Sequence, residues 1–115
     1  MNDSCVFCKI ANGKIPADLV YEDDDMVAFK DIDPRAPVHI LFIPRKHIET
    51  VNDISRDDAG LMARMILAAK DMAAEKGISG EGYRIVINCM KNAGQEVFHL
   101  HLHLLGGRVF SWPPG

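Results

Sequence analysis

The sequence has 115 residues, of which 48% are hydrophobic and 25% are charged, and this composition favours one compact globular domain over residues 1–115. The formal net charge of -3 shows no basic excess, which argues against polymeric nucleic acid as a partner and against a polybasic membrane patch. The longest apolar run, residues 38–44, is too short to span a bilayer, and the polar start lacks a signal-peptide pattern, so we expect a cytoplasmic protein that does not enter membranes.

Three short segments rich in β-branched and aromatic residues come first, at residues 19–22, 26–30 and 38–43. The aspartates at 23–25 and the prolines within 33–37 suit tight or irregular connections between these segments. The spacing therefore predicts three strands of an antiparallel meander.

A helical pattern replaces the strand pattern over residues 55–76, with Ser55 and Asp58 as a start signal and Gly77 as a stop. The main apolar row at helical spacing consists of Leu61, Met65, Ala68, Ala69 and Met72. A second apolar row consists of Met62, Ile66 and Ala73. This second row predicts either a surface for a partner chain or a wider intramolecular core, and both readings stay open.

Two further strand candidates follow the helix, at residues 83–88 and 99–105, and a polar, glycine-containing loop at 91–96 joins them. With the meander they make five strands. Five strands around one long helix predict an α+β fold with an antiparallel sheet.

Three of the five histidines alternate with leucines in the last strand candidate. Because side chains alternate across a strand, we expect His99, His101 and His103 on one face and the leucines buried on the other. Neighbours on that face lie about 6 to 7 Å apart, so the row could bind a metal, hold phosphate oxygens, or carry out proton and nucleophile chemistry. Three positions on one straight strand converge poorly on a tetrahedral ion, which favours phosphate chemistry over zinc held by all three.

The His-x-His-x-His run resembles the active-site motif of the histidine triad (HIT) family of nucleotide-binding proteins. Segments similar to that family also occur in order at residues 7–10, 14–17, 21–24, 28–32, 36–39 and 43–48. The chain end, Gly106-Gly107-Arg108 and then residues 112–115, is similar to the purine nucleoside phosphoramidase branch. The resemblance implies a HIT-like fold with a short N-terminal helix, and a homodimer.

The same resemblance implies a hydrolase that cleaves purine nucleoside phosphoramidates or acyl nucleotides to the nucleoside monophosphate. His101 would attack phosphorus and form a nucleotidyl-histidine that water then cleaves, His103 would offset developing charge, and His99 would complete the catalytic triad. Imidazole suits this role, because it is largely neutral and nucleophilic near pH 7. No cofactor is expected to be required for catalysis.

A site for a purine nucleotide of AMP or GMP type follows from the resemblance as well. Asp31 would accept hydrogen bonds from the ribose hydroxyls, and Trp112, in a proline-rich tail, would shape selectivity for the leaving group. The apolar walls around the base would be Phe7, Ile10, Phe29 and Ile32. The phosphate side would comprise Asn88, Gly94, Gln95 and Val97, together with His101 and His103.

Glu96 departs from the family pattern, because the phosphoramidases often place a serine that touches phosphate there. A carboxylate so close to an anion would normally repel it. We therefore expect that Glu96 points away from the phosphate or that the substrate preference differs.

Cys5 and Cys8 form a Cys-x-x-Cys pair, and the odd total of three cysteines argues against a disulfide framework. The pair has metal-ligand spacing, and His47 and His99 could complete a tetrahedral set like that of some bacterial relatives. Such a zinc would be structural. Two reduced thiols that pack at the start of the domain are the alternative.

Two other functions stay open at the level of the sequence. A dinucleoside polyphosphate hydrolase or nucleotidyltransferase would use the same histidine intermediate with a different leaving group. A nucleotide sensor or interaction protein would bind the nucleotide without turnover. The intact triad at His99, His101 and His103 favours an enzyme.

Overall fold

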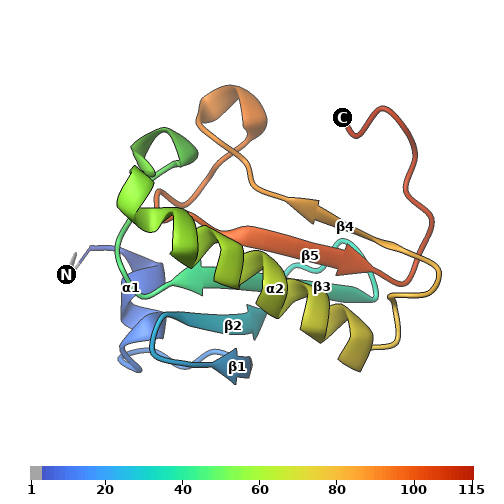
Figure 1. Cartoon of the computed structure of the whole chain (residues 1–115), viewed down its shortest axis with the longest axis horizontal. Helices are drawn as coiled ribbons and strands as arrows, with labels where there is room; N and C mark the ends of the chain where they lie inside the picture. The colour runs from blue at the N-terminus through green and yellow to red at the C-terminus, as the bar shows by residue number, and fades with distance from the viewer. Residues whose placement is uncertain (1–3) are drawn as a thin grey trace.

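The computed structural model describes residues 4–115, so the polar start at 1–3 lies outside the described residues, and it contains one five-stranded antiparallel sheet (Figure 1). The strands are β1 (Leu19–Glu22), β2 (Met26–Lys30), β3 (Val38–Pro44), β4 (Tyr83–Val86) and β5 (Leu102–Gly106). Their order in the sheet is β1-β2-β3-β5-β4. The predicted α+β class with five strands is confirmed, although the meander covers only the first three strands and β5 lies between β3 and β4.

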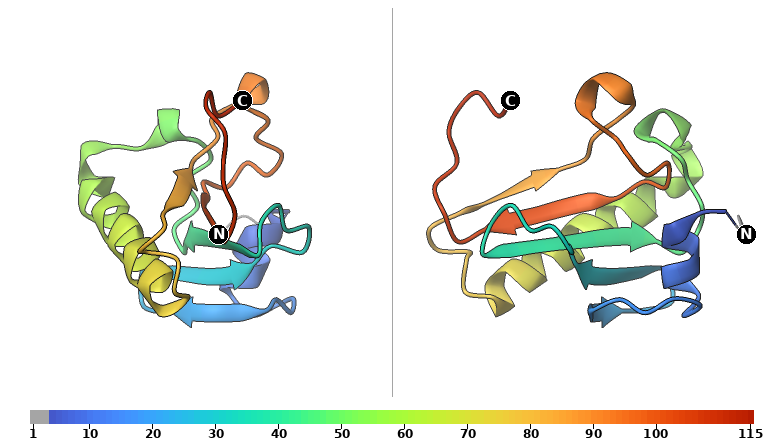
Figure 2. Two further views of the ribbon diagram at one scale, coloured as in Figure 1. Left: turned by 90° about the vertical axis from the view of Figure 1, so that its right-hand side faces the viewer. Right: turned by 180° about the vertical axis from the view of Figure 1, so that it is seen from behind.

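Two α-helices cover opposite faces of the sheet: α1 (Val6–Ala11) and α2 (Ala59–Glu75) (Figure 2). The helix predicted over residues 55–76 begins later than expected, because a 3-10 turn, Arg56–Asp58, precedes it. The Asp58 carboxylate accepts hydrogen bonds from the Ser55 backbone N–H at 3.0 Å and from its hydroxyl at 3.1 Å, which closes that turn. Neither helix in the described part of the chain is long and apolar enough to cross a membrane.

The larger core lies between α2 and one face of the sheet. Its buried residues from the histidine run are Leu100, Leu102 and Leu104, as the alternation predicts. Burial of each such side chain contributes roughly 1.5–3 kcal/mol. The second apolar row of the helix is split, because Ala73 is buried in this core while Ile66 is 50% exposed.

A smaller cluster fills the space between α1 and the other face of the sheet. It contains Phe7, Cys8 and Ala11 from the helix, and Phe29 and Leu41 from β2 and β3. The same face carries the histidines, since β5 pairs with β3 so that Leu41 and His103 are opposite each other. Helix α1 therefore forms one wall of whatever site the histidines create.

Candidate active site

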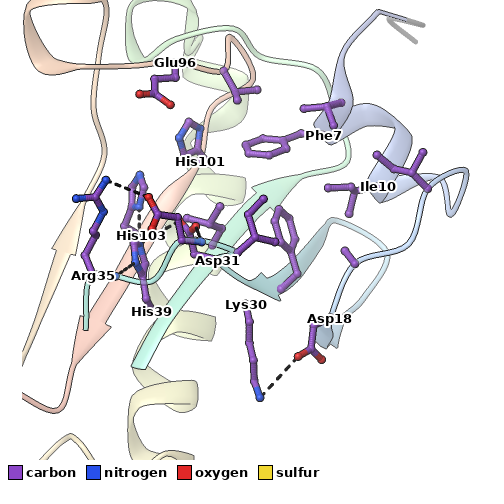
Figure 3. A pocket seen from close by; sticks show the side chains of 18 of the residues that line it. Phe7, Ile10, Asp18, Lys30, Asp31, Arg35, His39, Glu96, His101 and His103 are labelled. Atoms are coloured by element: carbon purple, nitrogen blue, oxygen red, sulfur yellow. Dashed lines mark hydrogen bonds and ion pairs between the residues drawn. The ribbon is translucent and has the colours of Figure 1, made fainter. Parts of the chain in front are cut away.

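A cavity of about 620 Å³ opens on the α1 face of the sheet (Figure 3). Helix α1, the segment around residues 29–35, the loop at 88–97 and the histidine run each contribute to its wall. Most of the predicted nucleotide contacts line it: Phe7, Ile10, Phe29, Asp31, Ile32, Asn88, Gly94, Val97, His101 and His103. The fold thus brings together in one cavity residues that lie far apart in the sequence.

Three of the residues predicted for catalysis or nucleotide binding lie outside this cavity wall: Gln95, His99 and Trp112. The buried Gln95 amide bonds to the backbone of its own and neighbouring segments, with Oε1 accepting from Met90 N–H at 2.8 Å and Nε2 donating to Glu49 O at 2.8 Å. Gln95 therefore holds the loop in place rather than facing a ligand. Trp112 is 82% exposed in the tail.

His101 is held in one tautomer by the backbone. Its Nδ1 lies 2.8 Å from the carbonyl oxygen of His99, and a carbonyl can only accept, so Nδ1 carries the proton. The lone pair is then on Nε2. The Phe7 ring and the imidazole pack nearly perpendicular to each other, with 5.1 Å between ring centroids, and this contact restricts the ring plane. In this tautomer the buried His101 thus presents a nitrogen nucleophile, Nε2, to the cavity.

His103 is held in the opposite tautomer by His39, a residue that was not predicted for the site from the sequence. The Arg35 backbone N–H donates to His39 Nδ1 at 3.0 Å, so the proton of His39 is on Nε2. That Nε2 donates to Nδ1 of His103 at 2.9 Å. The remaining His103 nitrogen, Nε2, is therefore an N–H donor, and within the described residues it is buried without a hydrogen-bond partner. A buried unpaired donor at a cavity wall suits an anionic ligand.

Burial keeps the imidazoles of His103 and His39 uncharged. It lowers the pKa of His103 to about 4, with the neighbouring His101 and His39 adding to the effect, and it lowers the pKa of His39 below its ordinary value. Asp31, whose Oδ2 lies 3.4 Å from His39 Nε2, opposes the shift in both but does not overcome it. At neutral pH His39 and His103 therefore offer neutral N–H donors rather than imidazolium cations.

Asp31 follows β2 directly and lies at the cavity. Its Oδ1 accepts the Asp33 backbone N–H at 2.8 Å, which fixes the carboxylate, and its oxygens retain lone pairs for further donors. The arrangement can accept hydrogen bonds from hydroxyl groups of a ligand. Ile32 beside it is fully exposed at the rim.

A second cluster lies next to the cavity and consists of Cys5, Cys8, His47 and His99. All four ligand atoms lie within 4.8 Å of one another. Individual separations are 3.3 Å for Cys5 Sγ to His99 Nδ1, 3.2 Å for Cys8 Sγ to His47 Nδ1 and 3.1 Å between the two Nδ1 atoms. Bonds of about 2.0–2.3 Å to a tetrahedral zinc would separate such ligands by roughly 3.3–3.8 Å.

The hydrogen bonding of His99 also fits a metal. Its Nε2 lies 2.7 Å from the Pro44 carbonyl oxygen and so donates a proton, which leaves the Nδ1 lone pair aimed at the two sulfurs. Burial lowers the pKa of His99 to about 4, so the ring is neutral as a ligand must be. The His99 ring thus belongs to the cysteine cluster, while its carbonyl oxygen serves His101.

Comparison with known proteins identifies the class: residues 12–110 match the HIT domain model, and the chain belongs to the HIT family. The purine nucleoside phosphoramidase of Escherichia coli K12 is 48% identical over 108 residues, which cover 94% of this chain and 91% of that protein. A HIT-like protein of Synechocystis is 50% identical over 115 residues and the full length of both chains.

Solved structures agree with this assignment. A HIT family hydrolase from Legionella pneumophila has a TM-score of 0.95 and 55% identity, covering 96% of this chain and 99% of that one. A zinc-bound histidine triad protein from Mycobacterium smegmatis has a TM-score of 0.79 and 36% identity, covering 91% and 76%. The predicted family and HIT-like fold are confirmed, and the protein is a HIT family hydrolase.

Proposed function

We propose that the protein hydrolyses purine nucleoside phosphoramidates or acyl nucleotides to the nucleoside monophosphate, with His101 as the nucleophile. The observation that carries this proposal is the pair of opposite tautomers: an Nε2 lone pair on His101 and an Nε2–H donor on His103 at the wall of one cavity. The phosphoramidase name of the Escherichia coli relative supports the same substrate class.

In the first step the His101 Nε2 lone pair attacks the α-phosphorus and the bond from phosphorus to the leaving nitrogen breaks. The amine departs with a proton that its nitrogen gains from water, and the His103 N–H stabilises the phosphoryl oxygen. The resulting imidazole carries phosphorus on Nε2 and a proton on Nδ1. Its positive charge is stabilised by the His99 carbonyl oxygen 2.8 Å away.

In the second step the oxygen of a water molecule attacks phosphorus, the bond to Nε2 breaks, and the electron pair returns to His101. The water gives up its proton to solvent. One phosphoramidate and one water thus yield one nucleoside monophosphate and one amine. With an acyl nucleotide the phosphorus–oxygen bond breaks instead and a carboxylate leaves.

The nucleotide assignments form part of this proposal. Asp31 accepts from the ribose hydroxyls, and Asn88 and the backbone around Gly94 contact the phosphate side. The base lies against apolar side chains of Phe7, Ile10, Phe29 and Ile32. What supports these roles is that all of these residues line the cavity that contains His101 and His103.

We further propose a structural Zn²⁺ held by Cys5, Cys8, His47 and His99, and a homodimer. The separations of the four ligand atoms and the zinc-bound relative support the metal site. When bound, zinc would link α1 to the segments that carry His47 and His99, without a part in the reaction. For the dimer the support is the exposed apolar pair Ile66 and Leu67 on α2.

The test is mass spectrometry after brief mixing with an adenosine 5′-phosphoramidate and a quench that avoids acid. A nucleotidyl adduct on His101, followed by release of AMP, is expected for the wild type and not for His101→Ala or His101→Gly. Nucleotide binding with neither adduct nor AMP would instead indicate a sensor. Product analysis with a dinucleoside polyphosphate separates the rival hydrolase activity.

A further inference from the structure

The cavity has more negative than positive charge, although the proposed function puts a phosphate in it. Its charged lining residues are Asp18, Lys30, Asp31, Asp33, Arg35 and Glu96. Lys30 Nζ lies 3.7 Å from Asp18, and both side chains are mostly exposed. Arg35 donates to Asp33 at 3.1 Å. Each cation is thus beside an aspartate, and among the described residues no lysine or arginine is paired with Glu96.

Glu96 lies at the part of the cavity where the reacting phosphorus would be. Figure 3 shows its carboxylate on one side of His101, with Asp31 on the other side. Of the proposed nucleoside contacts, Phe7 packs against His101 itself, and Ile10 and Asp31 lie farther from Glu96. In-line attack by His101 directs the leaving group away from the attacking nitrogen, and a flexible chain on the leaving group can reach the exposed Glu96 at the cavity wall.

The backbone at Glu96 is held in place by the neighbouring residue Gln95. The Gln95 side chain makes hydrogen bonds to Met90, Glu49 and Val97, and the Gln95 backbone N–H donates to Met90 O at 3.2 Å. The loop is thereby tied to the body of the protein on both sides of Glu96. The carboxylate is exposed, and so it is available to a ligand.

A carboxylate next to a bound phosphate repels it, and the two cations of the cavity wall, Lys30 and Arg35, are already paired with Asp18 and Asp33. The repulsion is offset when the ligand itself carries a cation on that side. A protonated amine three or four carbons beyond the leaving nitrogen reaches about 5–6 Å past it, close enough to interact with Glu96.

We propose that Glu96 selects phosphoramidates whose leaving group carries a second, protonated amine, as in monoamides of diamines. This inference rests on the proposed function and names the leaving-group class for the same site. An attraction between unit charges about 6 Å apart in a mostly aqueous dielectric corresponds to roughly a three- to tenfold preference in kcat/KM.

The experiment compares two substrates that differ only in that charge: the AMP monoamide of 1,4-diaminobutane and its N-acetylated, neutral counterpart. The four-carbon spacer keeps the leaving nitrogen similar in the two. The measured quantity is the ratio of the two kcat/KM values, which does not depend on the amount of folded enzyme. It is determined for the wild type, for Glu96→Gln and for Glu81→Gln. Glu81 is an exposed carboxylate outside the cavity lining.

We expect a ratio of about three to ten for the wild type, a ratio near one for Glu96→Gln and an unchanged ratio for Glu81→Gln. Added salt should lower the wild-type ratio. A wild-type ratio near one that Glu96→Gln leaves unchanged would overturn the role of Glu96 while leaving phosphoramidase activity intact. No AMP from either substrate would overturn both this inference and the proposed function.

Discussion

At the scale of single residues, the site depends on which nitrogen of each imidazole carries the proton. His101 and His103 are two positions apart, yet the first is oriented by the carbonyl oxygen of His99 and the second by the Nε2–H of His39. One therefore presents a lone pair and the other a donor. In the proposed reaction, two identical side chains thus act as a nucleophile and as a charge-stabilising donor.

His39 is predicted to be a positioning residue, and His39→Phe tests this. Loss of its donor frees His103 to adopt the other tautomer, so kcat should fall on the order of 10- to 100-fold, while KM changes less because the nucleotide wall is intact. Steady-state kinetics measures both constants, and ¹⁵N NMR of His103 reports its tautomer. His39→Gln, which retains an N–H donor, should keep more activity; equal kcat in wild type and His39→Phe would contradict the role.

Much of the site could be predicted residue by residue, because a two-residue period and a family motif are both local properties of the sequence. What the pattern could not indicate is hydrogen-bond geometry. His39 lies on β3, and only the register that puts Leu41 opposite His103 brings His39 close to His103. The same limit applies to Gln95, whose amide turns to the backbone of Glu49 and Met90.

At the scale of elements, the histidine run serves two clusters on one face. Strand β5 begins at Leu102, so the strand predicted from residue 99 is shorter than expected. The side chains nevertheless keep alternating ahead of it, since Leu100 is buried with the leucines of β5. His99 then meets the cysteines of the α1 segment, and His101 faces the cavity.

Metal binding gives a prediction at this scale. Excess free Zn²⁺ should raise the melting temperature of the wild type by several degrees, because a ligand at 100 times its Kd adds about 2.7 kcal/mol of stability. Cys8→Ser should abolish the increase, since Cys8 Sγ lies 3.2 Å from His47 Nδ1 and 3.5 Å from His99 Nδ1. Calorimetry or thermal fluorescence with and without a chelator makes the measurement.

The third cysteine provides the matched control. Cys89 is outside the cluster, so Cys89→Ser should respond to zinc as the wild type does. A zinc response of equal size in Cys8→Ser would show that the metal binds elsewhere. Because the carbonyl oxygen of His99 also orients His101, loss of the metal should lower kcat as well as stability.

The elements themselves were largely predictable, and their arrangement was not. Periodicity identifies the strands and the long helix, because it follows from which side chains are buried. Strand order depends on contacts between distant segments, such as β3 with β5, and no local pattern encodes that pairing. The predicted helix start at residue 55 was early for a different reason, since Ser55 and Asp58 cap a 3-10 turn there.

At the scale of the whole molecule, the fold buries histidines in their uncharged form, and this lowers the stability of the folded protein in acid. His103 has a pKa of about 4 in the folded protein, against an ordinary value near 6.5, and that of His39 is lowered too. Between these values the unfolded chain binds more protons than the folded one. Stability therefore decreases as the pH falls from about 6.5 toward 4.

Carboxylates affect the stability of the fold in a separate, lower pH range. The Lys46 ammonium 2.7 Å from Asp58, together with the hydrogen bonds from Ser55, holds the pKa of that carboxyl at about 2. A carboxyl with a depressed pKa loses its stabilising effect only as the pH falls below its ordinary value of 3.8. Measurements between pH 5 and 7.5 therefore report on the histidines.

The melting temperature should accordingly fall between pH 7.5 and pH 5, and His103→Asn should show a smaller fall because it removes one group that takes up a proton on unfolding. The proteins with and without His103→Asn are best compared when both also carry Cys8→Ser, so that release of metal in acid does not contribute to the change in melting temperature. His103→Asn also changes the contact with His39 and so lowers stability at pH 7.5. The informative quantity is therefore the slope of the melting temperature against pH. Equal slopes with and without His103 would mean that its burial does not hold it neutral, and the donor role of its Nε2–H would fail with it.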